Sequence, residues 1–138
     1  MEEKDLKALF IKIGKSNQYR PKEELDKISL KRGAKRFIRN FGLSHSPIQY
    51  LTFYFNGERK SIVRKKQKVL DVIISSGLAD NTNSANEVFE FIKGKEFTYY
   101  ASDNDAIQES FELREVTSSK GDIRYDLFLR EKMPGGVI

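Results

Sequence analysis

Five cationic side chains lie close together in the first half of the chain and share one side of a predicted helix. They are Lys31, Arg32, Lys35, Arg36 and Arg39. At 100° per residue they fall within an arc of about 140°, and the apolar residues of the same segment fall outside it. Such a face can neutralise the phosphates of a nucleic acid. Because like charges so close together repel, a purely structural surface would gain by placing Glu among them.

Two alternatives stand beside this interpretation of the cationic face. It could be an ordinary solvated helix surface that is rich in Lys and Arg, or it could lie on a membrane surface. The membrane alternative is disfavoured because the apolar side of the same helix is needed for the core. We therefore expect a polyanion as the partner of this helix.

A second set of candidate binding residues lies in two β-prone runs, 50–55 and 58–65, which are separated by Asn56-Gly57. This dipeptide is typical of a type I′ hairpin turn. Pairing across the turn places Tyr54 opposite Arg59 on one face, and the other face directs Ile62 toward the core. Rings beside cations can hold a nucleic acid, because bases stack on the rings. The contact residues predicted in the hairpin region 50–66 are Tyr50, Tyr54, Arg59, Arg64, Lys65 and Lys66; a purely structural, Tyr-rich strand pair is the alternative.

Charge is distributed unequally along the chain. Residues 1–70 hold 18 Lys and Arg against 7 Asp and Glu, a balance of +11, whereas residues 71–138 hold 7 against 13, a balance of −6. The basic half is expected to meet a polyanion, and the acidic half to scaffold the site or to bind a protein. The alternative is an assembly protein, such as a viral structural component or a small inhibitor, that associates through its oppositely charged halves.

Few side chains could carry catalysis. His45 is the only histidine and lies in no recognisable nucleophile motif, and without Cys there is no thiolate nucleophile, thiolate metal site or disulfide. Glycine-rich phosphate loops and the H-E-x-x-H zinc motif are also missing from the sequence. Asp103, Asp105, Glu109 and Glu112 could form a cryptic metal-dependent nuclease, although their spacing does not select one. We expect a non-enzymatic protein without a cofactor or bound metal.

The elements that must position these residues follow from the spacing of apolar side chains. Residues 6–13 predict a helix that ends near Gly14. A second helix begins after Pro21 and is expected to break near Ser29, which would cap a new helix over 30–41 that ends at Gly42. Apolar residues in 69–74 predict a further helix before Gly77.

The remaining elements are one helix and three strands. Ser84 to Glu87 matches an S-x-x-E capping box, which predicts a helix running to Gly94. Although 70–92 has the order helix, turn, helix, its second helix is too acidic for a DNA recognition helix. Alternation predicts strands over 96–101, 107–116 and 123–130, the last two joined by a turn at 117–122.

Together these features predict one α+β domain over 1–138. Its helical N-terminal half contains an inserted β-hairpin and is followed by a C-terminal antiparallel meander. Of the 138 residues, 38% are hydrophobic and 33% are charged, and there is no apolar run long enough for a membrane span. The acidic start of the chain does not look like a signal peptide. We expect a soluble protein of the cytoplasm, or of a host cell or virion if its source is viral.

Overall fold

The computed structural model describes residues 1–15, 19–42, 60–100 and 108–132 of the chain. Four helices and four strands lie within these ranges: α1 (Glu3–Gly14), α2 (Lys22–Phe41), β1 (Lys60–Arg64), α4 (Lys66–Ser75), α5 (Thr82–Ile92), β2 (Glu96–Tyr100), β3 (Gln108–Thr117) and β4 (Ile123–Lys132). The predicted α+β class and the C-terminal meander are confirmed. No helix in the described ranges is both long and apolar enough to cross a membrane.

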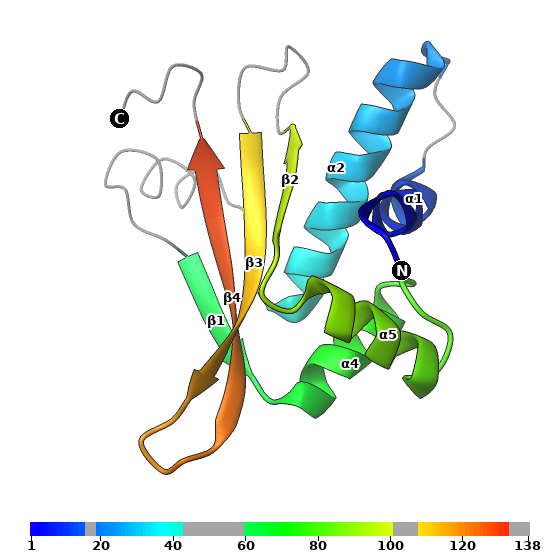
Figure 1. Cartoon of the computed structure of the whole chain (residues 1–138). Helices are drawn as coiled ribbons and strands as arrows, with labels where there is room; N and C mark the ends of the chain where they lie inside the picture. The colour runs from blue at the N-terminus through cyan, green and yellow to red at the C-terminus, as the bar shows by residue number, and fades with distance from the viewer. Residues whose placement is uncertain (16–18, 43–59, 101–107, 133–138) are drawn as a thin grey trace.

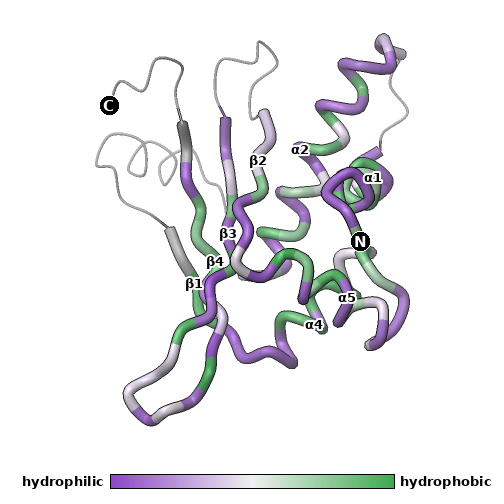
Figure 2. The backbone as a smooth tube through the Cα atoms, viewed as in Figure 1, coloured by the Kyte–Doolittle hydropathy of each residue, from purple (hydrophilic) through white to green (hydrophobic). Residues whose placement is uncertain are grey.

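The strands form a single antiparallel sheet in the order β1-β4-β3-β2. Strand β4 therefore lies between β3, its neighbour in sequence, and β1, which comes much earlier in the chain. The helices gather on one side of this sheet (Figure 1). Hydrophobic and hydrophilic residues succeed one another along the helices, as amphipathic elements require (Figure 2).

A group of phenylalanine rings joins the helices to the sheet. The ring of Phe10 on α1 lies 4.8 Å from that of Phe97 on β2, and the ring of Phe37 on α2 lies 5.4 Å from that of Phe111 on β3, measured between centroids. All four side chains are buried. Because each buried ring contributes roughly 1.5–3 kcal/mol, this cluster holds α1 and α2 against the sheet.

Helices α1 and α2 touch backbone to backbone. A Cβ atom added to Gly33 would collide with the Phe10 carbonyl, and one added to Gly14 would collide with the Ser29 carbonyl. Ser29 is buried within α2, which runs without interruption from Lys22 to Phe41. The predicted break near Ser29 is therefore wrong: a small residue is needed there for close packing, not for a cap. The predicted end of the helix is right, since Gly42 has φ 120° and donates its N–H to the Arg39 carbonyl at 3.0 Å.

The start of α5 also differs from the prediction. The helix begins at Thr82, and the side chain of Asn81 accepts a hydrogen bond from the Ser84 N–H at 2.9 Å. The Ser84 hydroxyl in turn accepts from the Asn81 N–H at 3.2 Å. Ser84 is thus the third residue of the helix rather than its cap, because Asn81 completes the reciprocal pair three residues earlier.

The second run of the predicted hairpin contains a strand, β1, in which Ile62 packs toward the core as expected and Val63 is exposed. The helix predicted over 69–74 is confirmed as α4. The first hairpin run, 50–55, and the turn lie outside the described residues. So do His45, Asp103 and Asp105.

Candidate nucleic-acid interface

All five predicted cations of the basic helix lie on α2, but the structure divides them between two surroundings. Lys31 and Lys35 are half-buried on the side of the sheet, whereas Arg32, Arg36 and Arg39 are exposed. The Lys35 Nζ lies 4.0 Å from the Glu109 Oε1 of β3. The five cations therefore do not share the same surroundings, because β3 brings a carboxylate to the lysine side of α2.

Lys27, one turn before Lys31, extends this lysine row toward the sheet edge. Its Nζ lies 5.2 Å from the centroid of the Tyr100 ring at the end of β2, a cation–π distance. The residues Lys27, Lys31 and Lys35 are spaced four apart and so share one side of the helix. This row therefore joins α2 to the sheet as well as carrying charge.

The three exposed arginines face a depression of about 680 Å³, which we name the basic groove. Its floor is α2, and the ends of α1 and α4 form its sides. The lining residues are Ile13, Gly14, Lys15, Arg32, Lys35, Arg36, Arg39, Asn40 and Ser75. Five of these nine are cationic and none is acidic. The volume is within the range of ligand-binding pockets, about 300–1,000 Å³.

The sides of the basic groove are held by contacts in the middle and at the C-terminal end of α2. The Gly33–Phe10 contact sets the end of α1 beside the middle of α2, so that Lys15, the residue directly after α1, reaches the groove. Near the C-terminal end of α2, the Asn40 amide donates to the Ser76 hydroxyl at 3.1 Å and joins α2 to α4. Lys15 was not predicted as a site residue, because only the tertiary contact between α1 and α2 brings it there.

Side-chain charge is what would attract an anion to this groove. Helices α1 and α4 both end at it, and a helix end with free carbonyl groups carries a partial negative charge that disfavours anions. The charge of Lys35 is also shared with Glu109, a buried carboxylate that accepts a hydrogen bond from the Tyr99 hydroxyl at 2.9 Å. Lys15 and the three exposed arginines therefore supply most of the positive field.

The cations predicted near the hairpin do not line the basic groove. Arg64 donates to the Val63 carbonyl at 3.2 Å, and its guanidinium lies beside Gly42 at the end of α2. The Nζ of Lys66 lies 5.2 Å from the Phe89 ring centroid, and Lys65 is exposed at the start of α4. None of Arg64, Lys65 and Lys66 is among the lining residues of the groove. Tyr50, Tyr54 and Arg59 lie outside the described residues, and their predicted role stays a prediction.

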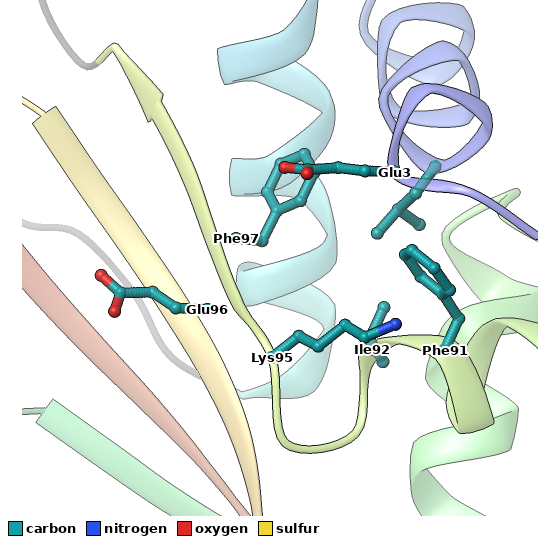
Figure 3. A pocket seen from close by; sticks show the side chains of 7 residues that line it. Glu3, Phe91, Ile92, Lys95, Glu96 and Phe97 are labelled. Atoms are coloured by element: carbon teal, nitrogen blue, oxygen red, sulfur yellow. The ribbon is translucent and has the colours of Figure 1, made fainter.

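A second depression, of about 440 Å³, lies where the start of α1, the end of α5 and the start of β2 meet (Figure 3). Its lining residues are Glu3, Leu6, Phe91, Ile92, Lys95, Glu96 and Phe97. The Nζ of Lys95 lies 3.5 Å from the Phe91 ring centroid, so this cation already has an aromatic partner. With two carboxylates and one cation around an apolar floor, the site does not favour phosphate.

The resolved pKa shifts belong to contacts at other places in the fold. Burial, and then the neighbouring Glu115, raise the pKa of Tyr125, whose hydroxyl donates to Glu115 at 3.3 Å. A hydrogen bond from Lys93 to Glu90 raises the pKa of that half-buried lysine. Among the residues that the structure describes, no cluster of three or more His, Asp or Glu side chains could hold a metal ion.

Comparison with known proteins adds no relative to these observations: no family model, no curated protein and no solved structure matches the chain. The functional argument therefore depends on the residues of the basic groove.

Proposed function

We propose that this protein is a small nucleic-acid-binding accessory protein that holds the phosphates of its ligand in the basic groove. The observation that carries the proposal is the lining itself, in which Lys15, Arg32, Lys35, Arg36 and Arg39 surround one concave site. Four of these cations come from α2, and Lys15 directly follows the end of α1. Phosphate contacts of this kind supply most of the affinity of sequence-independent nucleic-acid binding.

The arrangement of the arginines supports an anionic ligand. Arg32 and Arg36 are four residues apart on α2, and Arg36 and Arg39 are three apart, so each pair lies on the same side of the helix. Like charges at these spacings destabilise a helix by a few tenths of a kcal/mol per pair. A bound phosphate between them would replace this repulsion with attraction.

The charge balance of the chain agrees with this site. The residues before position 71 carry a balance of +11, and four of the five groove cations come from α2 within that half. A field of this sign steers a polyanion toward the groove and speeds association at low salt. The acidic half would then limit nonspecific contact on the other parts of the surface.

The test is binding of labelled single-stranded DNA, duplex DNA and RNA of equal length, measured by fluorescence anisotropy. Wild type is compared with a groove variant, Arg32→Gln, Arg36→Gln and Arg39→Gln together, and with a control variant of equal charge. The control changes Lys7, Lys68 and Lys120 to Gln; these residues are exposed and lie outside the groove.

We expect the groove variant to bind at least about tenfold more weakly at about 50 mM salt, and the control variant to stay within about threefold of wild type. Gln has a helix propensity close to those of Arg and Lys, so circular dichroism should show both variants folded. If no nucleic acid binds wild type at low salt, or if both variants lose affinity equally, the proposed function is wrong. Light scattering at low and high salt would then test the alternative, self-association through the oppositely charged halves.

A further inference from the structure

The shape and lining of the basic groove point to a more specific ligand. Resting on the proposed function, we infer that the groove holds a single nucleic-acid strand by two or three consecutive phosphates, without contact to its bases. Three independent features of the described residues carry this inference: the position of the cationic surface between the ends of two other helices, the spacing of its residues and the absence of aromatic rings from its described lining.

The cationic surface of α2 is recessed between two other helices. The end of α1 stands on one side, where the backbones touch at Gly33, and the end of α4 stands on another, tied by the bond from Asn40 to Ser76. A helix that reads duplex DNA enters the major groove and must project beyond its neighbours. A duplex is also a stiff rod, whereas a single strand can bend its backbone into a recess.

The spacing of the floor residues matches a short run of phosphates. Arg32, Arg36 and Asn40 are four residues apart, and a rise of 1.5 Å per residue separates neighbours by about 6 Å along the helix axis. The row is therefore about 12 Å long. Lys35 and Arg39 form a parallel row beside it. Such a length accommodates two or three successive phosphates of one strand.

None of the nine described lining residues is aromatic, and their apolar part is limited to Ile13 and Gly14. Strand-binding proteins that hold bases use ring faces, because stacking of one base is worth roughly 5- to 150-fold in affinity. The amide of Asn40, which could read a base edge, already donates to Ser76. Among the described residues the groove therefore offers charge to the backbone and no aromatic ring on which bases could stack, so binding should depend little on base sequence.

A competition experiment tests this inference. A labelled single strand is displaced from wild-type protein by an unlabelled strand, by an abasic strand with the same number of phosphates and by a duplex. We expect the abasic strand to compete within about threefold of the base-bearing strand, since loss of even one stacked base would cost more than this. The duplex should compete at least about tenfold more weakly per phosphate, despite its higher charge density.

The outcomes separate this inference from the proposed function. A duplex that competes as well as the single strand, or an abasic strand that is more than about tenfold weaker, overturns the inference while nucleic-acid binding still stands. Failure of every competitor and of the labelled strand itself overturns both. The groove variant locates the site: if it keeps full affinity for the single strand, phosphates are bound elsewhere and the inference is wrong.

Discussion

Replacing the three exposed arginines of the basic groove by Gln should change the salt dependence of single-strand binding, not only its strength. Each phosphate that a protein neutralises on a single strand contributes about −0.7 to the slope of log affinity against log salt. Two or three phosphates in the groove therefore contribute about −1.4 to −2.1. Phosphate contacts made elsewhere on the protein add equally to wild type and variant, so the difference between the two slopes isolates the groove.

This difference is large enough to measure. Between about 50 and 200 mM salt, a slope difference of 1.4 to 2.1 reduces the advantage of wild type over the groove variant by about 7- to 18-fold. Anisotropy titrations with a labelled homopolymeric strand at four salt concentrations give both slopes. The variant with changed Lys7, Lys68 and Lys120 should run parallel to wild type, because these lysines lie outside the groove.

Two results would refute the reasoning. Parallel lines for wild type and the groove variant would mean that Arg32, Arg36 and Arg39 do not neutralise phosphates, even if the variant binds more weakly. A slope difference well above about 3 would mean that more phosphates are engaged than a row about 12 Å long can hold.

The other predictions concern the scaffold and the electrostatics around the groove. Gly33→Ala should lower the melting temperature although Ala is the better helix former by about 1 kcal/mol, because overpacking against α1 costs about 1–3 kcal/mol; a raised melting temperature would contradict the close helix contact. Asn81→Ala should cost about 1 kcal/mol in urea unfolding, whereas Glu87→Ala should stay within about 0.5 kcal/mol, and equal losses would contradict the observed cap. Burial raises the pKa of Tyr125, so the contribution of its neutral hydroxyl to folding stability is complete below the unfolded pKa of about 10 and is lost as the pH rises through the folded pKa. Tyr125→Phe should therefore flatten the dependence of unfolding free energy on pH over this range, and an unchanged dependence would contradict the raised pKa. Glu109→Gln should strengthen strand binding by up to about fivefold, because the lysine paired with this carboxylate then directs its full charge into the groove; weaker binding by a folded variant would be inconsistent with that ion pair.

Much of the fold could be predicted from local patterns. The alternation of residues in 107–116 and 123–130 identified β3 and β4, and Gly42 identified the end of α2, because these signals depend on neighbouring residues alone. The predicted helix break at Ser29 was wrong because a small polar residue can serve either as a helix cap or as a contact for a second helix. The choice between these two uses depends on α1, whose Gly14 lies against the Ser29 carbonyl of α2.

The candidate site was predictable only in part. A helical projection places the five predicted cations of α2 on one side, but it cannot show that β3 sets Glu109 opposite Lys35. Nor can it show that α1 ends beside α2 and adds Lys15. The side chain of Lys66 packs over Phe89, which is 23 positions away in sequence and has no charge to mark it as a partner. Surfaces assembled from several helices depend on tertiary contacts, and these leave little trace in local spacing.

The position of β4 in the middle of the sheet affects how the chain is made. Strand β1 has β4 as a neighbour, and Lys60 pairs with Leu129, so a growing chain holds β1 without its β4 neighbour until almost all the described residues have been synthesised. Helices α1 and α2 are close in sequence and can meet early, but the phenylalanines that they bury need strands β2 and β3. Through most of translation the nascent chain therefore exposes a strand edge and an aromatic surface, which are features that invite aggregation and recruit chaperones.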